Sequence, residues 1–377
     1  MRVAIVSDIV SGAIGGVERF TVSISEELRK RGLKIDVYDR SVLEHWQERW
    51  YDRYFMYQRR NMQLGAAVWR QLTFNRSDTD VIIQNSVAGW NLRQKTGIPR
   101  IVIHHGSVRG LYHIQMAAAV SWRMKLNRYL GLIHLKGGVE QFTAQGAVSV
   151  AVSSAVAEEL KRYYKGIDPV VIPNGIDVGH FAPQERKRCR EKYGMSDDAF
   201  VVCFTARFGV LGKGFEEIRA LAERAWQERL RFRFLIGTDE PPRGWPANVT
   251  FVKNVSYQDL PEFYSAADLF FFPSRYEGCS YSLLEAMACG LPILTTRVGY
   301  AKDLYRDVQA LVPFILEKND IDAYWKIMLS LVDKPDFLRA LGDAGAEYVR
   351  QHNSLKAMVD SYIELIEKVA QKKKALS

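Results

Sequence analysis

Short, continuous apolar runs recur along the whole chain, separated by stretches with the apolar spacing of amphipathic helices. Because successive rather than alternate positions are apolar, these runs predict strands buried on both faces of a parallel sheet. The clearest runs lie at 1–7, 80–84, 100–104, 200–205 and 232–236. An amphipathic stretch at 17–30 follows the first run and leads to another short strand. The pattern therefore predicts an α/β chain with doubly wound sheets.

One stretch in the second half combines several of these signals. The apolar run 267–272 predicts a buried strand that Pro273 ends. A loop rich in Gly and Ser follows, then a helix over 283–289 that Gly290 stops, and a strand over 293–296. A strand, a loop and a helix in this order can bind phosphate, because the backbone N–H groups and the dipole at the helix N-terminus favour an anion.

Two carboxylates frame this loop. Glu277 follows the strand, and Glu285 lies eight residues later, in the first turns of the helix. A carboxylate directed at a phosphate would repel it, so both side chains better suit neutral hydroxyl groups, such as those of a ribose or a hexose. The simpler alternative is a surface loop acid and a favourable first-turn charge.

The segment EGCSYSLLEAMACGLPILTT resembles the E-x7-E signature of the retaining GT-B glycosyltransferases, especially glycosyltransferase family 4. Other parts of the family pattern follow the same order, including GGVER, HHG, VIPNGID with FAP after it, and AR followed by KG. The resemblance extends from residue 1 to about residue 360. It implies two Rossmann-like domains that face each other across a cleft, with a C-terminal helix that crosses back to the N-terminal domain.

The resemblance also suggests site residues in the first half. Gly15 and Gly16 match the family's GG-x-E motif, whose bare backbone lies close to the donor; a tight turn without a ligand is the alternative. His105 precedes Gly106 at the end of an apolar strand, where α/β proteins bind ligands. The family histidine at this place contacts the donor sugar. His104 is the alternative if the register differs by one residue, and a structural histidine is the other.

In the second half, Arg207 and Lys213 lie near a glycine turn after a strand. Two fixed cations there can neutralise a diphosphate leaving group without a metal, and the family uses this pair for the distal phosphate. The predicted donor site comprises Gly15, Gly16, Arg207, Lys213, Gly278, Cys279, Ser280, Tyr281, Ser282 and Glu285, with Glu277 and His105 as the catalytic residues. The sequence has no His/Cys ligand cluster, so we expect no metal and no cofactor.

The predicted domains are 1–178, joined by about 358–377, and 179–357. Residues 184–198 are highly charged and suggest a linker. A last short strand is expected over 311–315, and helices from 320 onward.

The chain of 377 residues carries a net charge of +9, which is concentrated in one region. Residues 51–150 hold 13 Lys and Arg against 4 Asp and Glu, whereas the remaining residues carry 39 of each sign. Such a region suggests an anionic membrane face, a phosphorylated acceptor or nucleic acid. An aromatic-rich helix is expected over 43–74. Basic Arg123, Lys125 and Arg128 interleave with large apolar residues, which suits an interfacial helix or a packed helix with a solvated basic face.

The four cysteines form no CxxC pair, and neither a signal peptide nor a membrane span is evident, so we expect a cytoplasmic protein, peripheral on the inner face of the cytoplasmic membrane. The predicted activity is retaining transfer from a nucleotide sugar, a UDP-sugar by preference, to a glycan or lipid-linked acceptor in lipopolysaccharide or surface polysaccharide synthesis. The alternatives are a DNA-modifying glucosyltransferase and a non-catalytic sugar-nucleotide sensor. A dinucleotide-dependent oxidoreductase is disfavoured because GxGxxG is missing.

Overall fold

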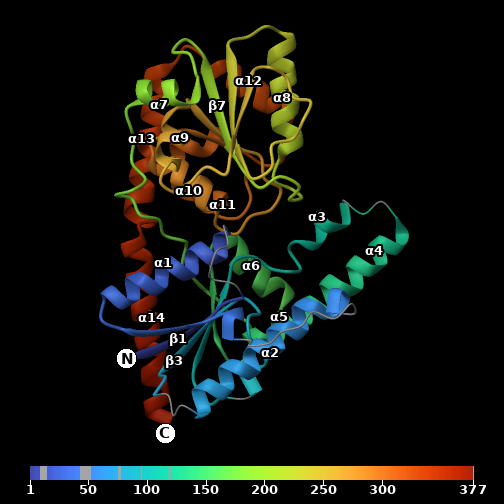
Figure 1. The fold of residues 1–377 in the computed structure, drawn as a ribbon, viewed down its shortest axis with the longest axis vertical. Coiled ribbons are helices and arrows are strands. Elements are labelled where there is room, and N and C mark those ends of the chain that lie inside the picture. The colour runs from blue at the N-terminus through green and yellow to red at the C-terminus, as the bar shows by residue number, and fades with distance from the viewer. Residues whose placement is uncertain are drawn as a thin grey trace. The chain divides into compact units, whose positions relative to one another are not determined.

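The chain folds into two compact units, each built around one parallel sheet (Figure 1). The computed structural model describes residues 1–8, 15–42, 52–74, 78–94, 96–117, 119 and 121–376. The first unit contains Met1–Asn174 and Met358–Ser377, and the second contains Gly175–Ala357. The predicted boundary after residue 178 lies four residues beyond Asn174.

The first unit has a six-stranded sheet in the order β2-β1-β3-β4-β5-β6, and all its strands are parallel. The strands are β1 (Arg2–Val6), β2 (Lys34–Tyr38), β3 (Val81–Asn85), β4 (Arg100–His104), β5 (Val148–Ala151) and β6 (Val170–Val171). Strands β1, β3 and β4 are almost wholly buried, as their continuous apolar runs predict.

Helices of the first unit are α1 (Gly16–Lys30), α2 (Asp52–Phe74), α3 (Tyr112–Ala117), α4 (Trp122–Tyr129), α5 (Gly137–Ala144), α6 (Ser154–Tyr163) and α14 (Leu355–Leu376). Short turns of 3-10 helix, η1 (Arg40–Val42) and η2 (Trp90–Gln94), and a π-helix, η3 (Leu130–Lys136), complete the unit. Ser153 caps α6 by accepting from the Val156 N–H. The part of the expected 43–74 helix that contains Trp46 and Trp50 lies outside the described residues.

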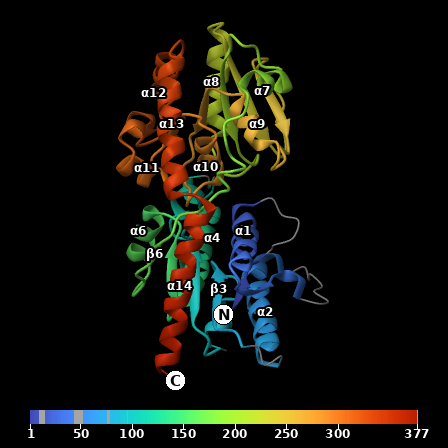
Figure 2. The same ribbon diagram turned by 90° about the vertical axis from the view of Figure 1, so that its left-hand side faces the viewer.

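Helix α14 returns to the first unit, where it packs beside α1 (Figure 1). The rings of Phe20 and Tyr362 meet edge to face with centroids 5.8 Å apart, and both side chains are fully buried. Arg31 Nη1 donates to Asp360 Oδ1 over 2.6 Å. Figure 2 shows α14 running alongside the sheet of this unit. The core of the first unit is therefore completed by a helix from the far end of the sequence.

The second unit has a six-stranded parallel sheet in the order β12-β11-β10-β7-β8-β9. The strands are β7 (Phe200–Thr205), β8 (Phe232–Thr238), β9 (Val249–Lys253), β10 (Leu269–Phe272), β11 (Ile293–Thr296) and β12 (Ile315–Leu316). Read from β9, this is the strand order 3-2-1-4-5-6 of a Rossmann domain, with the reversal between β7 and β10. The predicted α/β class with doubly wound sheets is confirmed.

Helices of the second unit are α7 (Arg186–Tyr193), α8 (Phe215–Gln227), α9 (Leu260–Ser265), α10 (Tyr281–Ala288), α11 (Ala301–Asp307), α12 (Ile321–Leu331) and α13 (Pro335–His352). Helix α10 begins two residues earlier than predicted. The strand expected over 311–315 is mostly wrong: residues Gln309–Phe314 form a 3-10 helix, η4, and the strand β12 begins only at Ile315. Residue Pro313 cannot donate to a sheet ladder, which accounts for the difference.

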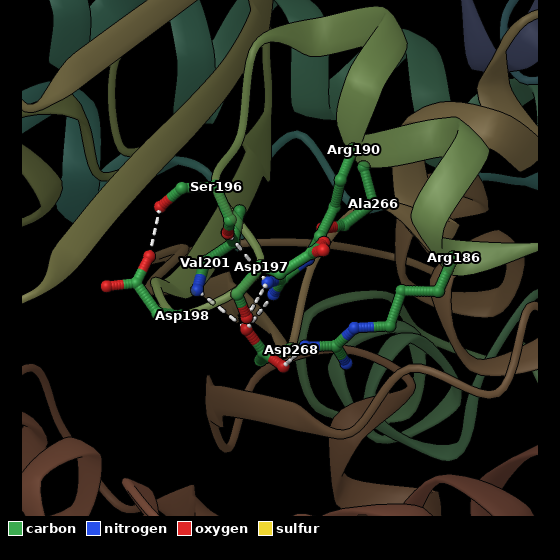
Figure 3. A network of polar contacts seen from close by, with 8 residues as sticks. All are labelled: Arg186, Arg190, Ser196, Asp197, Asp198, Val201, Ala266 and Asp268. Carbon is green, nitrogen blue, oxygen red and sulfur yellow. Dashed lines mark hydrogen bonds and ion pairs between the residues drawn. The ribbon is translucent and has the colours of Figure 1, made fainter.

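The charged stretch 184–198 is not a linker, because it contains helix α7. Arg190 of this helix is 1% exposed, and its guanidinium reaches the Asp268 carboxylate just before β10, with Nη2 and Oδ2 2.6 Å apart (Figure 3). Arg186 binds the other oxygen of Asp268, and the Val201 N–H donates to Oδ2 over 2.7 Å. The helix is therefore held by one buried and one partly exposed ion pair, which a count of charges along the sequence cannot reveal.

Residues 107–146 surround Arg123, Lys125 and Arg128 and do not form a single helix. They divide into α3, α4, η3 and α5, and α4 has no buried residue. In Figure 1, α3 and α4 extend away from the sheet of their unit.

Candidate active site

The reversal of strand order between β7 and β10 brings two loops of the second unit together. Strands β7 and β10 are direct neighbours, with Leu269 opposite Val202 and Phe270 opposite Cys203. The loop 206–214 leaves the carboxyl end of β7, and the loop 273–280 leaves the carboxyl end of β10. Parallel strands place their carboxyl ends at one sheet edge, and open α/β sheets bind ligands where the strand order reverses. Arg207, Lys213 and Glu277 all belong to these two loops.

Lys213 and Glu277 form an ion pair. The Lys213 Nζ lies 2.5 Å from the Glu277 Oε1, and their side chains are 29% and 12% exposed. Ser274 donates from its hydroxyl to the same carboxylate oxygen over 2.8 Å. Ser274 itself is fully buried, and its carbonyl accepts from Thr296. The fold thus brings together two of the predicted site residues and adds a serine that the sequence motif did not single out.

The glycine turn that carries Lys213 is packed tightly against the second loop. Gly214 has φ +92°, and a Cβ atom there would lie 2.4 Å from the Pro273 Cγ and 3.0 Å from its carbonyl oxygen. The Arg275 N–H donates to the Gly212 carbonyl over 2.7 Å. Only glycine fits this turn, because the left-handed backbone and the close approach both exclude a side chain.

A second ion pair joins the same two segments. Arg275 Nη2 lies 2.5 Å from Glu217 Oε1 and 3.3 Å from Glu216 Oε2, both on the first turn of α8. Glu217 is buried and also accepts from Asn319 over 3.1 Å. Sequence reasoning missed Arg275 and Glu217, although a cation two residues before Glu277 in the motif loop was a visible signal.

Glu285 lies on the inner side of α10. Its side chain is 1% exposed, and its Oε2 accepts from the Tyr264 hydroxyl over 3.1 Å. Ser280 is the N-cap residue of α10, and its Oγ lies 3.0 Å from the Ser282 Oγ.

The loop before α10 has its own fixed backbone. Gly299 has φ +51°, and a Cβ atom there would lie 2.5 Å from the carbonyl oxygens of Glu277 and Gly278. The Tyr300 N–H donates to the Gly278 carbonyl over 2.8 Å. The segment Gly278, Cys279, Ser280, Tyr281 and Ser282 therefore connects Glu277 to the helix N-terminus along a constrained path.

The other predicted residues belong to the first unit. His104 ends β4, is fully buried, and its Nδ1 lies 3.4 Å from Glu140 Oε1. His105 is the next residue and is only half-buried, with Nε2 3.2 Å from Asn85 Oδ1. Its ring meets Phe20 edge to face with centroids 5.0 Å apart. Burial, followed by the neighbouring His104, lowers the pKa of His105 to about 4, so the ring is neutral at ordinary pH.

Asn85 ties His105 to the start of α1. Its Nδ2 donates to Thr21 Oγ1 over 2.7 Å, and Thr21 Oγ1 donates to the Val17 carbonyl over 2.8 Å. Gly15 is the extended N-cap residue of α1, and Gly16 is its first residue. Residues 9–14 of the glycine-rich turn lie outside the described part of the chain. Asn85 was not predicted, although a polar residue ending an apolar strand is the signal that pointed to His105.

Helix α4 carries the predicted basic residues. Arg123 and Lys125 are exposed, and the Arg123 guanidinium lies 5.5 Å from the Trp122 ring centroid. Arg128 is half-buried and donates to the Gln115 carbonyl. Large apolar side chains are exposed beside them, namely Trp122 (69%), Leu126 (47%), Tyr129 (42%), Leu130 (50%) and Leu135 (43%).

Comparisons with known proteins agree with this architecture. The profile of a family described as "Glycosyltransferase Family 4" matches residues 14–180, and that of "Glycosyl transferases group 1" matches residues 242–348. D-inositol 3-phosphate glycosyltransferase 2 of Catenulispora acidiphila is 27% identical over 305 residues, which cover 74% of this chain and 68% of that protein. Matches to two further D-inositol 3-phosphate glycosyltransferases cover 59% and 56% of those proteins.

Solved structures share the fold along nearly the whole chain. Anabaena HepE in complex with UDP-glucose has a TM-score of 0.72 at 15% identity, covering 98% of this chain and 100% of that one. WaaG, a glycosyltransferase involved in lipopolysaccharide biosynthesis, has a TM-score of 0.73 at 17% identity, covering 97% and 99%. The two Rossmann-like units therefore share the GT-B fold, and the two family profiles identify the chain as a glycosyltransferase. Within that class, the chain belongs to glycosyltransferase family 4. The predicted family is confirmed.

Proposed function

We propose that this protein transfers a sugar from a UDP-sugar, with retention of anomeric configuration, to a glycan or lipid-linked acceptor of lipopolysaccharide or surface polysaccharide. The observation that carries the proposal is the meeting of Lys213 and Glu277 at the strand-order reversal of the second sheet. A UDP-sugar is favoured because HepE, which shares the fold, was solved with UDP-glucose.

In this proposal the donor binds the second unit. Arg207, Lys213 and the backbone N–H groups at the start of α10 receive the diphosphate, because cations and a helix N-terminus stabilise an anion. Glu285 accepts from ribose hydroxyls, and Glu277 accepts from hydroxyls of the sugar. His105 of the first unit stays a prediction from the family resemblance, and its ring is neutral at ordinary pH.

The chemistry rests on stabilising the leaving group and positioning the reactants. As the bond from the anomeric carbon to the diphosphate breaks, negative charge grows on the departing phosphate oxygen. Lys213 and Arg207 neutralise that charge, so no metal is required. Full activity in excess chelator supports this step, and loss of activity that added metal restores contradicts it.

The first test is thermal unfolding with UDP, GDP and ADP in the presence of chelator. A ligand that binds only the folded state adds RT ln(1 + [L]/Kd), about 2.7 kcal/mol at one hundred times Kd. We expect a shift with UDP that Glu285→Gln weakens. Tyr264→Phe is the matched control, because it removes the hydroxyl that donates to Glu285 and keeps the carboxylate. The absence of a shift with every nucleotide would refute the donor site.

We further propose that α4 and η3 bind an anionic membrane surface that presents the acceptor. The support is the set of exposed apolar side chains next to Arg123 and Lys125, a combination typical of interfacial helices. No helix in the described part of the chain is both long and apolar enough to cross a bilayer.

Sedimentation with vesicles tests the membrane proposal. We expect binding to vesicles rich in anionic lipid at low salt, and loss of binding in Trp122→Ser with Arg123→Glu. Trp226→Ser is the control, because Trp226 is a 51% exposed tryptophan in the second unit. Equal sedimentation of both variants would exclude α4 as the contact. Binding to duplex DNA that falls steeply with salt would instead favour the DNA-modifying alternative.

A further inference from the structure

Two ion pairs join the segment 213–217 to the loop after β10. Lys213, in the turn before α8, pairs with Glu277 of the loop after β10. Arg275, in that second loop, pairs with Glu217 of α8. Each segment therefore supplies one cation and one carboxylate to the other.

The two pairs differ in what else their members can do. Glu217 is buried on α8 and shared with Asn319, and Arg275 is anchored through its own N–H to Gly212. Lys213 and Glu277, in contrast, are both donor ligands in the proposed function. In the structure, the Lys213 ammonium and the Glu277 carboxylate pair with each other.

We propose that Lys213 and Glu277 change partners when the donor binds. The diphosphate takes the Lys213 ammonium, and the Glu277 carboxylate, released from it, accepts from hydroxyls of the sugar. The inference rests on the proposed donor site. It adds that the ion pair with Glu277 keeps the Lys213 ammonium occupied until a diphosphate binds.

The surrounding contacts allow this exchange without disturbing the loops. Ser274 still donates to Glu277 after Lys213 leaves, so the carboxylate keeps one fixed hydrogen bond. The Arg275–Glu217 pair, the Gly212 carbonyl and the Gly214–Pro273 contact hold the turn in place. The pair also screens the negative charge of Glu277, which would otherwise repel an approaching diphosphate.

The exchange has an unusual consequence for binding of the nucleotide alone. UDP lacks the sugar that is transferred, so it gains nothing from the released Glu277 but must still break the ion pair. Glu277→Gln removes that competition, and the glutamine amide oxygen can still accept from Ser274. The variant should therefore bind UDP more tightly than the wild type while losing transfer activity.

Isothermal titration of UDP into full-length protein measures this effect. We expect Glu277→Gln to tighten UDP binding about fivefold, the equivalent of the roughly 1 kcal/mol that a partly exposed ion pair contributes. Glu216→Gln is the matched control, because it removes one negative charge from the same neighbourhood at a side chain that is 84% exposed and pairs with Arg275. We expect the control to bind UDP within about twofold of the wild type.

A double variant identifies the origin of the gain. In a Lys213→Ala background, Glu277→Gln should no longer tighten binding by the same factor, because there is no ammonium to release. If the wild type binds UDP and Glu277→Gln binds it equally or more weakly, then Glu277 does not compete with the diphosphate for Lys213. The proposed change of partners is then wrong, whereas the donor site is retained. If wild type binds none of UDP, GDP and ADP, the proposed function fails and the exchange with it.

Discussion

At the scale of single residues, the site depends on pairs that are distant in sequence. Lys213 and Glu277 are 64 positions apart, yet their charged atoms lie 2.5 Å apart. His105 similarly meets Asn85 from the neighbouring strand and Phe20 from α1. The identity of each residue was visible in the sequence, whereas its partner came from the fold.

The burial of His105 gives a prediction about pH. Its pKa is about 4 in the folded protein and about 6.5 in an unfolded chain, so the unfolded chain binds more protons between these values. The neutral His105 ring therefore makes its full contribution to stability above a pH of about 6.5, and this contribution is lost as the pH falls toward about 4.

Urea unfolding at pH 7 and pH 5 measures this contribution. On acidification from pH 7 to pH 5, we expect the unfolding free energy of the wild type to fall by about 1 kcal/mol more than that of His105→Gln. This figure allows for solvent screening of a half-buried ring. An equal loss in both proteins would show that the His105 ring is protonated in the folded state at pH 5.

At the scale of elements, the strand-order reversal between β7 and β10 decides which loops meet, and glycines decide how closely. Gly214 permits the turn before α8 to lie against Pro273. Gly299 permits its own backbone to lie close to the carbonyl oxygens of Glu277 and Gly278. Ion pairs then fasten elements to one another, as Arg190 and Arg186 fasten α7 to the start of β10 (Figure 3).

Gly214→Ala is expected to harm both stability and donor binding. The new Cβ atom would meet Pro273 at 2.4 Å and would require a left-handed backbone, so the turn that holds Lys213 must shift. We expect a loss of more than about 2 kcal/mol in unfolding free energy and weaker UDP binding. Gly194→Ala is the control, because φ there is +67° but no atom of the described residues lies within 4 Å of the added Cβ. Equal effects of the two variants would mean that backbone strain alone, and not the contact with Pro273, limits the turn.

The buried ion pair of α7 gives another prediction at this scale. Arg190→Met leaves the Asp268 carboxylate with less compensation in a buried position, so we expect destabilisation of about 3 kcal/mol. Arg188→Met on the same helix is the control, since its side chain is 76% exposed and its ion pair with Glu262 is long, at 3.5 Å. Chemical unfolding compares the two variants, and a similar small loss in both would show that Asp268 does not depend on Arg190.

At the scale of the whole molecule, the two units differ in how the chain builds them. The second unit is continuous, from Gly175 to Ala357, and contains Arg207, Lys213, Glu277 and Glu285. The first unit needs Met358–Ser377 as well, because Val359, Tyr362 and Ile366 of α14 are fully buried in it.

The continuity of the second unit predicts that a fragment of residues 175–357 folds by itself and binds UDP. The expected signs are a cooperative melt and a UDP-dependent rise in the melting temperature that Glu285→Gln weakens. A fragment of residues 1–174 should lack a cooperative melt, because α14 is missing from its core. A folded 175–357 fragment that does not bind UDP, when the full chain does, would show that the second unit alone is insufficient for the donor.

The sequence by itself determined most of the strands, the α/β class and the family, because these depend on local patterns: apolar runs, caps, glycines and the E-x7-E spacing. Only the tertiary structure decided that 184–198 contains a helix with a buried arginine, that His105 and not His104 is half-exposed, and that Lys213 pairs with Glu277 and Arg275 with Glu217. Each of these depends on contacts between segments far apart in the chain, and burial or ion pairing at such contacts has no signature in the neighbouring residues.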